Sequence, residues 1–337
     1  MKALIVQTAF IGDVILTLPF VECIKNVPEI KSIDYLATPD VYNILERNPN
    51  LGKIIIYDKR GKDKGLVNLF RIIDEIKREK YDIAYIPHRS IRSAIIPLLA
   101  GIKERVGFNT SAASFFLTEK IIYNKNIHEI ERNLSLLSLN SKLCEKKQPE
   151  ICFDKGDTEK VEQFFRTNEI KEDEKLVGIA PGSRWETKRW LKERFAELIK
   201  LLKERKNVRS ILFGSERDFQ ICEQINYLSE FAGINTAGIF TPRQSSIAMG
   251  KTNVVVTNDS GSTHLAVAGN ARVITIYGAT IPGFGFYPYG NGHKIIEKNI
   301  ECRPCGIHGG EKCPLEHFKC MRNITTEEVF EQVCEFI

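Results

Sequence analysis

Short apolar runs alternate with amphipathic stretches along most of the chain. In the first half, apolar runs rich in β-branched residues predict buried strands over 3–8, 32–37, 53–57, 82–87 and 104–108. Helical spacing of apolar residues predicts helices near 14–26, 40–47, 66–80, 90–100 and 128–143. Strands that alternate with helices indicate right-handed βαβ units and a parallel sheet.

The second half repeats this pattern. Strands are expected over 175–180, 208–213, 253–257 and 272–277, and helices over 192–206, 217–231, 243–250, 262–269 and 325–336. The fold class we predict is α/β, with two Rossmann-like, doubly wound domains facing a central cleft. The expected boundaries are 1–150 for the N-terminal domain, 151–175 for a linker region, 176–324 for the C-terminal domain and 325–337 for a C-terminal helix.

The composition supports a two-domain globular protein. The chain has 337 residues, 43% of them hydrophobic and 27% charged. Asp13 interrupts the apolar start and no small-residue cleavage site follows, so we expect no signal peptide and a cytoplasmic protein. Residues 1–150 hold 23 Lys and Arg against 18 Asp and Glu, whereas the two signs balance beyond them. This excess favours an anionic partner for the first half.

An acidic residue, Asp13, lies where the first strand gives way to a helix. One interpretation is structural, because a carboxylate there accepts from the free N–H groups of the first helical turn. The other is functional, because open α/β folds bind ligands at the carboxyl edge of the sheet. Both interpretations stay open on this stretch alone.

The loop APGSRWETKRW, 180–190, follows a predicted strand directly. Gly182 and Ser183 offer backbone N–H groups, and Lys188 adds a positive charge next to Thr187. A strand followed by a small-residue turn and cations is typical of a phosphate site, although the P-loop motif is absent. A solvated basic loop is the alternative.

A second loop, TNDSGSTHLAVAG at 257–269, also follows a predicted strand. Ser260 and Gly261 begin a small-residue helix whose N-terminus suits a diphosphate. Asp259 would repel a diphosphate, so we expect it to order the loop or to accept from a sugar hydroxyl. His264 is either a packed helix residue or a ligand contact.

Four cysteines, Cys302, Cys305, Cys313 and Cys320, have metal-like spacing in a Gly- and Pro-rich segment. A structural Zn²⁺ and free or buried thiols remain alternatives. The nine cysteines of the chain form an odd count, which does not indicate a secreted disulfide scaffold.

Six motifs occur in order across nearly the whole chain: GDVILTLP, HRSIRSAIIPLLAGIKERVGF, PGSRWETKRW, NDSGSTHLA, IYGAT and CRPC…CM. Together they resemble glycosyltransferase family 9, the bacterial heptosyltransferases of lipopolysaccharide core assembly. The resemblance implies the GT-B architecture and an inverting transfer of heptose from ADP-heptose to a lipid-linked inner-core sugar.

The resemblance also implies roles for residues. It makes Asp13 the general base, which suits a reaction whose nucleotide diphosphate leaving group needs no acid catalyst. It places the nucleotide sugar in the C-terminal domain, and the expected donor-binding residues are Ser183, Thr187, Lys188, Glu216, Asp259, Ser260, Gly261 and His264. The sequence contains no D-x-D metal site, so no cofactor or metal is expected for catalysis, and the four cysteines would stabilise their loop.

The acceptor would bind the N-terminal domain. Arginines pair well with the phosphates and carboxylates of a lipid-linked saccharide. The expected acceptor-binding residues are Arg60, Arg89, Arg92 and Arg105. Such an acceptor implies peripheral contact with the cytoplasmic face of the inner membrane, and no nucleic-acid partner is expected.

Three other functions are weighed against this one. A dehydrogenase predicts G-x-G-x-x-G after the first strand, which AFIGDV does not supply. A non-catalytic metal-binding or thiol protein would leave the loops of Asp13 and Lys188 without a purpose. A transferase of the same family with another nucleotide sugar or glycan acceptor stays open, because donor selectivity depends on pocket shape.

Overall fold

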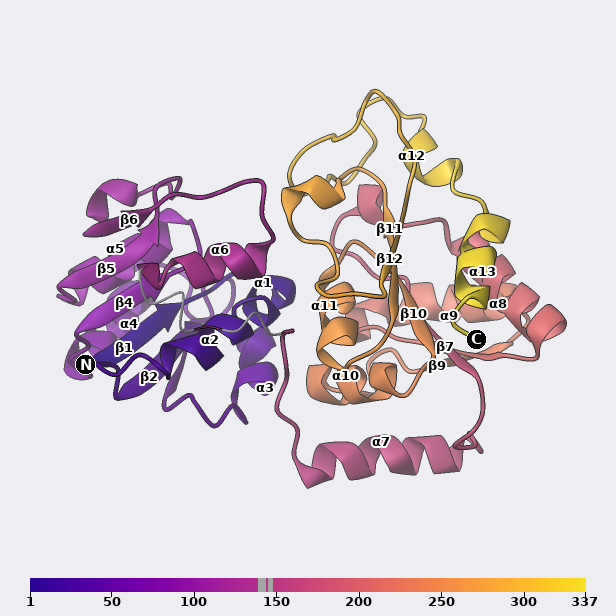
Figure 1. Ribbon diagram of the computed structural model, residues 1–337, viewed down its shortest axis with the longest axis horizontal. Helices are drawn as coiled ribbons and strands as arrows, with labels where there is room; N and C mark the ends of the chain where they lie inside the picture. Colours follow the sequence, from indigo (N-terminus) through magenta and orange to yellow (C-terminus); the bar gives the residue numbers. More distant parts are fainter. Residues whose placement is uncertain (139–143, 145–147) are drawn as a thin grey trace. The chain divides into compact units, whose positions relative to one another are not determined.

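The computed structural model of the chain describes residues 1–138, 144 and 148–337. By its internal contacts the chain divides into two compact units, unit 1 (Met1–Cys152) and unit 2 (Phe153–Ile337). Each unit is built on one six-stranded parallel sheet that helices cover on both faces (Figure 1). The predicted α/β class with two doubly wound sheets is therefore confirmed.

In unit 1 the strand order is β3-β2-β1-β4-β5-β6. The strands are β1 (Lys2–Val6), β2 (Ser32–Ala37), β3 (Ile54–Ile56), β4 (Ile83–Ile86), β5 (Glu104–Phe108) and β6 (Glu119–Ile121). The helices are α1 (Ile11–Ile15), α2 (Leu18–Ile24), α3 (Tyr42–Leu45), α4 (Leu66–Arg78), α5 (Ile91–Leu99) and α6 (Glu129–Ser135).

The central strand β1 is buried on both faces, as parallel sheets require. Leu4 and Val6 belong to a core that they share with Ile72 and Ile76 of α4 and Ile96 of α5. Ala3 and Ile5 of β1 are equally buried and point to the opposite face, because successive side chains of a strand point to alternate faces of the sheet. Helix α4 packs against α5, and α2 packs against α6.

Unit 2 repeats the arrangement with the strand order β12-β11-β10-β7-β8-β9. The strands are β7 (Leu176–Ala180), β8 (Arg209–Leu212), β9 (Gly233–Asn235), β10 (Val254–Asn258), β11 (Val273–Tyr277) and β12 (Lys294–Glu297). The helices are α7 (Lys155–Thr167), α8 (Lys192–Lys206), α9 (Phe219–Leu228), α10 (Pro242–Gly250), α11 (Gly261–Ala268), α12 (Lys319–Arg322) and α13 (Thr326–Cys334).

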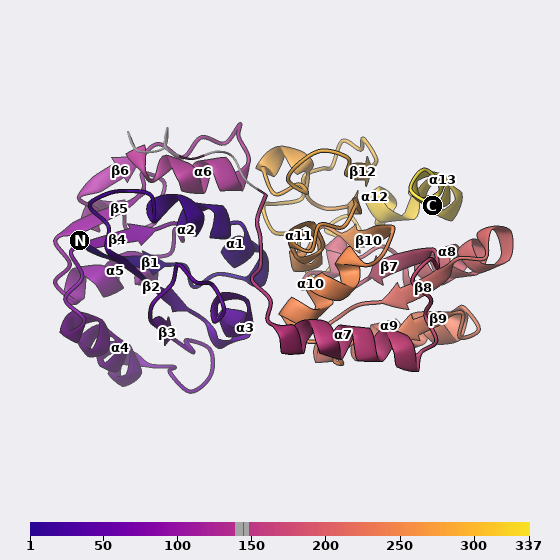
Figure 2. The same cartoon turned by 60° about the horizontal axis from the view of Figure 1, so that its bottom comes forward.

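Helix α8 packs between α9 and α13, and α10 packs between α11 and α7 (Figure 2). The range 151–175, expected as a linker, thus contains α7, and α7 contacts a helix of unit 2. In the described part of the chain no helix is both long enough and apolar enough to cross a bilayer.

The structure differs from the predicted elements mainly at the sheet edges. The strands β6, β9 and β12 were not expected; each lies at the edge of its sheet and has three or four residues, too few for a periodic pattern. The single helix expected over 14–26 is two helices, because Pro19 in the first turn of α2 starts a new helix. Of the helix expected over 128–143, α6 covers 129–135, and residues 139–143 lie outside the described residues.

A buried ion pair fastens α7 to α10. Arg243 Nε lies 2.6 Å from Asp157 Oδ2, and the two side chains are 6% and 5% exposed. Gln244 also donates to Asp157, through Nε2 at 3.2 Å. Removal of one partner from such a pair leaves a buried charge without its counterion, which is strongly destabilising.

We therefore expect Asp157→Ala to lower the free energy of unfolding by about 3–5 kcal/mol, measured by urea unfolding. Glu159→Ala on the same helix is the control, since Glu159 and its partner Lys155 are 61% and 90% exposed. That variant should change stability by less than about 0.5 kcal/mol. Equal effects of the two substitutions would contradict the structural role of the buried pair.

Candidate active site

The order of the strands fixes where each unit can bind a ligand. In unit 2 the chain winds from β7 outward to β9, and then starts again on the other side of β7 with β10. The loops that leave β7 and β10 therefore begin side by side at the carboxyl edge of the sheet. Doubly wound folds bind ligands at this reversal.

A lysine and a carboxylate meet at this point. Lys188 ends a short 3₁₀ helix, η4 (Glu186–Lys188), in the loop after β7, and Asp259 is the first residue after β10. Lys188 Nζ lies 2.5 Å from Asp259 Oδ2, with side-chain exposures of 13% and 10%. Thr280 Oγ1 donates to the same carboxylate oxygen at 2.6 Å. Asp259 thus orders the loop and holds Lys188 at the carboxyl edge of the sheet.

The loop after β7 is clamped at both ends by Asn258, the last residue of β10. Its Oδ1 accepts from the backbone N–H of Trp190 at 2.9 Å, and its Nδ2 donates to the carbonyl of Pro181 at 2.7 Å. The Trp190 ring is buried, and its Nε1 donates to the carbonyl of Ile324. Sequence reasoning missed Asn258, although it stands next to Asp259 in the quoted motif.

Two other expected donor-binding residues of this loop are buried. The Thr187 hydroxyl donates to the Gly310 carbonyl at 3.0 Å and accepts from the Gly310 N–H at 2.8 Å. Ser183 is 8% exposed, and its carbonyl accepts from Arg189 Nε at 2.8 Å. The structure thus fastens the loop to the cysteine-rich segment through Thr187.

Helix α11 starts beside this pair. Ser260 is its N-cap and accepts from the backbone N–H of Ser262 at 3.4 Å, Gly261 is the first helical residue, and His264 lies in the first turn at 4% exposure. The free N–H groups of this helix end lie at the same edge as Lys188. The chain therefore brings a cation and a helix N-terminus to one place.

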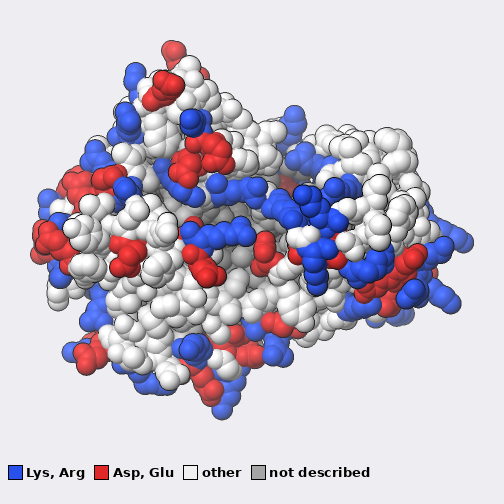
Figure 3. Space-filling view, turned by 180° about the vertical axis from the view of Figure 1, so that it is seen from behind, with Lys and Arg blue, Asp and Glu red and all other residues white. Residues whose placement is uncertain are grey.

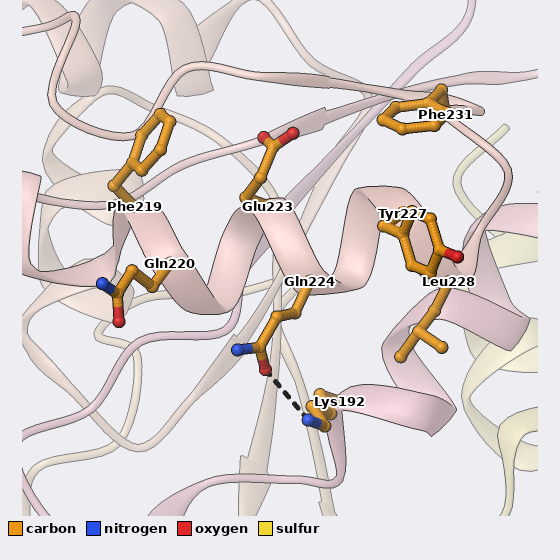
Figure 4. Close-up of a pocket in the computed structure, with 8 residues that line it drawn as sticks. All are labelled: Lys192, Phe219, Gln220, Glu223, Gln224, Tyr227, Leu228 and Phe231. Carbon is orange, nitrogen blue, oxygen red and sulfur yellow. Dashed lines mark hydrogen bonds between the residues drawn. The ribbon is translucent and has the colours of Figure 1, made fainter.

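Glu216 follows β8, the strand next to β7, in the exposed 3₁₀ helix η5 (Glu216–Asp218). Asp218 of the same helix lies next to Gly182 of the loop after β7. Glu216 lines a surface pocket with Ala237, Gly238 and Ile239. A neighbouring pocket on α9 is shown in Figure 4, and none of the expected site residues lines it.

Unit 1 has the same reversal of strand order, between β1 and β4. Thr8, after β1, and His88, after β4, meet there, with 3.1 Å between Thr8 Oγ1 and His88 Nδ1. Ser93 Oγ lies 2.9 Å from the same His88 nitrogen. Lys59, from the loop after β3, donates through Nζ to the Thr8 carbonyl at 2.5 Å. Sequence reasoning missed these residues, because no local motif relates positions 8, 59 and 88.

Burial sets the charge of this group. It lowers the pKa of Lys59 to about 8, with Arg60 and Arg92 adding to the effect and Asp13 opposing it. It lowers the pKa of His88 to about 4, helped by the charge of Lys59. At neutral pH His88 is therefore neutral, while Lys59 is mostly charged and loses its proton as the pH rises through 8.

Asp13 lies in the first turn of α1, partly exposed. Its Oδ2 accepts from the backbone N–H of Phe10 at 3.2 Å, which is the capping contact of the structural interpretation. Its charge also acts on Lys59, Tyr35 and Glu129. Asp13 therefore caps α1 and also lies at the carboxyl edge of the sheet, so the structural and the functional interpretation do not exclude each other.

Three of the four expected acceptor arginines lie near this edge. Arg60 stacks over the Phe10 ring at 5.0 Å, Arg89 stacks over the Tyr123 ring at 4.1 Å, and Arg92 is exposed in the first turn of α5. Lys and Arg side chains gather in patches on the face of the molecule in Figure 3.

The fourth expected acceptor residue, Arg105, lies at another edge of the sheet. It is the second residue of β5 and lies at the amino edge of the sheet, opposite to Asp13. Its guanidinium donates to the carbonyls of Phe116, Ile102 and Lys103, so it ties loops of unit 1 together.

The four cysteines do not form a metal site. All are free thiols, and no group of three or more His, Cys, Asp or Glu in the described residues is arranged to hold a metal ion. Cys302 Sγ lies 3.9 Å from His317 Nε2, and burial raises the pKa of the Cys320 thiol to about 11. The donor set as arranged does not fit Zn²⁺.

Two doubly wound parallel sheets are the GT-B architecture, which the chain shares with a solved heptosyltransferase structure. The chain belongs to glycosyltransferase family 9 (heptosyltransferase), whose sequence model matches residues 69–316. It is a glycosyltransferase, as the motifs predicted.

Relatives and solved structures agree with this assignment. The chain is 28% identical over 352 residues to lipooligosaccharide heptosyltransferase 2 of Haemophilus ducreyi, which covers 100% of this chain and 99% of that protein. It is similar to the glycosyl transferase family 9 structure from Veillonella parvula, with TM-score 0.87, 21% identity and 99% and 96% of the two chains covered. The E. coli ADP-heptose LPS heptosyltransferase II gives TM-score 0.78, 22% identity and 100% and 98% coverage.

The tether between Thr187 and Gly310 is open to a direct test. Thr187→Val removes both hydrogen bonds of the hydroxyl, each worth about 1 kcal/mol net. We expect the Gly310 amide to exchange hydrogen roughly fivefold faster in mass-spectrometric exchange of the 302–316 segment. Thr187→Ser keeps the hydroxyl and is the control. Equal exchange rates of the Gly310 amide in the two variants would show that the Thr187 hydroxyl does not tether the loop to Gly310.

Proposed function

We propose that this glycosyltransferase moves heptose, with inversion, from ADP-heptose to the lipid-linked inner core of lipopolysaccharide. The names of its relatives support the sugar and the acceptor class, since they are heptosyltransferases of lipopolysaccharide or lipooligosaccharide. The E. coli relative of similar fold is described as an ADP-heptose enzyme. The alternative is a transferase of the same family with another nucleotide sugar or glycan acceptor.

One observation carries the donor side of the proposal: Lys188 and the start of α11 meet where the strand order of unit 2 reverses. A diphosphate bound there would face an ammonium group and free backbone N–H groups. As the bond to the sugar breaks, negative charge grows on the diphosphate, and these groups stabilise it. The mechanism as proposed draws its positive charge from the protein and includes no metal.

The other donor residues are assigned by their positions. Ser260 and Gly261 would present the helix end to the diphosphate, and Glu216 would accept from the ribose hydroxyls. Ser183, Thr187, Asp259 and His264 would shape and hold the loops, because all four are buried.

Unit 1 would bind the acceptor. Asp13 would remove the proton from the attacking hydroxyl, since inversion needs one base on the face of the sugar opposite to the leaving group. Arg60, Arg89 and Arg92 would pair with acidic groups of the acceptor. The enzyme would act at the cytoplasmic face of the inner membrane, where a lipid-linked acceptor is anchored.

A screen of nucleotide sugars against lipid-linked acceptors, read by mass spectrometry, tests the function. The expected result is addition of one heptosyl residue from ADP-heptose only. Transfer from another nucleotide sugar would favour the alternative within the family. If no nucleotide sugar supports transfer to any of the acceptors, the proposed function is wrong.

Asp13→Asn tests the general base. The variant keeps the shape of the side chain, so the fold and ADP affinity should persist while kcat falls by ~10²–10⁴-fold. Asp40→Asn is the control, because Asp40 is an exposed carboxylate in the first turn of a 3₁₀ helix of the same unit. If Asp13→Asn turns over as fast as Asp40→Asn, Asp13 is only a cap.

Lys188→Ala tests the diphosphate site. We expect ADP affinity in calorimetry to fall by about 1–3 kcal/mol, the range for a charged hydrogen bond. Lys192→Ala is the control, because Lys192 begins α8 close by and bonds to Gln224. A double variant with Asp259→Asn should recover part of the loss, since it removes the carboxylate left next to the diphosphate. Unchanged ADP affinity in Lys188→Ala would exclude Lys188 from the site.

A further inference from the structure

Three large apolar side chains stand exposed on the first turns of α4. Leu66, Val67 and Phe70 are 72%, 82% and 56% exposed. They are neighbours on the helix surface, because residues three and four apart lie on one side. We call these three residues the α4 tip.

The α4 tip is not part of the core-facing side of the helix. Ile72, Ile73 and Ile76 already fill the contact with the sheet. Asp74 and Lys77 follow the tip on its own side of the helix, so the apolar area ends after about one turn. The fold of unit 1 therefore leaves a short apolar projection at the amino end of a helix.

In the segment before the α4 tip, the side chains of the two acidic residues bond within the segment or to α4. Asp63 is buried, accepts from the Asp58 backbone N–H at 2.8 Å and pairs with Arg71 at 2.5 Å. The Asp58 carboxylate accepts from the backbone N–H groups of Gly61 and Lys62 at 2.9 and 3.0 Å. Both carboxylates are thus used within the segment.

Two of the cations of the same segment point outward. Lys62 and Lys64 are exposed, and we call these two residues the basic rim. Residues 58–71 hold five Lys and Arg and two acidic residues, Asp58 and Asp63. Lys59 bonds to Thr8 and Arg71 pairs with Asp63, so the exposed positive charge next to the tip comes from Lys62 and Lys64. An apolar projection with cations beside it, and with the nearby carboxylates turned inward, is complementary to an anionic membrane surface. The apolar side chains suit the hydrocarbon layer, and the cations suit the negative headgroups above it.

We propose that the α4 tip inserts into an anionic phospholipid bilayer while the basic rim contacts the lipid phosphates. The purpose of this contact rests on the proposed function, because a lipid-linked acceptor requires the enzyme to reach a membrane. Binding to vesicles that contain no acceptor depends on the surface alone.

The chain offers a matched control on α9. Tyr227 is 68% exposed, and Phe231, three residues after α9, is 62% exposed; Figure 4 shows both at a pocket with Glu223 nearby. Glu230 pairs with Lys200 in the same region, so the charges there are mixed. This surface has similar apolar exposure without an excess of cations.

Vesicle sedimentation of the full chain tests the proposal, with phosphatidylcholine vesicles that contain or lack phosphatidylglycerol. Wild type should bind the anionic vesicles and release them at high salt. A variant with Leu66→Ser, Val67→Ser and Phe70→Ser should lose at least about tenfold in affinity, and Lys62→Gln with Lys64→Gln should lose several-fold. Tyr227→Ser with Phe231→Ser should bind as wild type does.

Val67→Trp gives a second measurement that does not depend on a triple substitution. The fluorescence of the added indole, taken as the difference from wild type, should shift to the blue on anionic vesicles and be quenched by brominated lipid chains. Equal binding of wild type to both vesicle types, normal binding by the triple variant, or a difference emission that vesicles leave unchanged would each overturn the proposal.

Kinetics separate this inference from the proposed function. The triple variant should use a water-soluble saccharide acceptor as wild type does and should lose activity only on acceptor embedded in vesicles. Failure of heptose transfer with intact vesicle binding would count against the proposed function alone. Equal activity of the triple variant on embedded acceptor would count against the α4 tip.

Discussion

In a doubly wound sheet the chain adds strands first on one side of its first strand and then on the other side. The loops that follow the two strands at this reversal lie next to each other, and no helix packs across them. This constraint acts twice here, between β1 and β4 and between β7 and β10. In each unit the residues that follow the two strands touch, Thr8 with His88 and Lys188 with Asp259. The polar groups of both candidate sites depend on this geometry, because it places them at an edge that the helices leave open.

The two reversal points hold a lysine by different means. Lys188 pairs with the carboxylate of Asp259, and in the proposed function an arriving diphosphate would compete with Asp259 for Lys188. Lys59 is held by the carbonyl of Thr8 and by burial, which lowers its pKa to about 8. The first arrangement favours a strongly charged ligand, whereas the second gives a cation that a modest rise in pH removes.

The cysteine-rich segment also has a structural role in unit 2. Its spacing is that of a metal site, yet the described residues bring no ligand set together. One of its contacts with the rest of unit 2 is Gly310, which bonds to Thr187 at both its N–H and its carbonyl. Others are the Cys305 N–H, which donates to the Ala279 carbonyl, and Arg303, which donates to the Thr280 carbonyl. The segment therefore supports the loop of Lys188 by backbone hydrogen bonds. A resident metal is not needed for that support.

The sequence by itself determined the central strands, most helices and the two loops of unit 2, because buried parallel strands are short apolar runs and their loops are local motifs. It did not determine the edge strands β6, β9 and β12, whose few residues gain their structure from one neighbour. It did not show that Arg105 lies at the amino edge of its sheet, because a position along the chain does not tell which edge of the sheet a side chain reaches. Only the tertiary structure showed that Thr8, Lys59 and His88 lie together and that Asn258 clamps the loop after β7. Hydrogen bonds between residues far apart in sequence produce no periodic pattern in the amino-acid sequence.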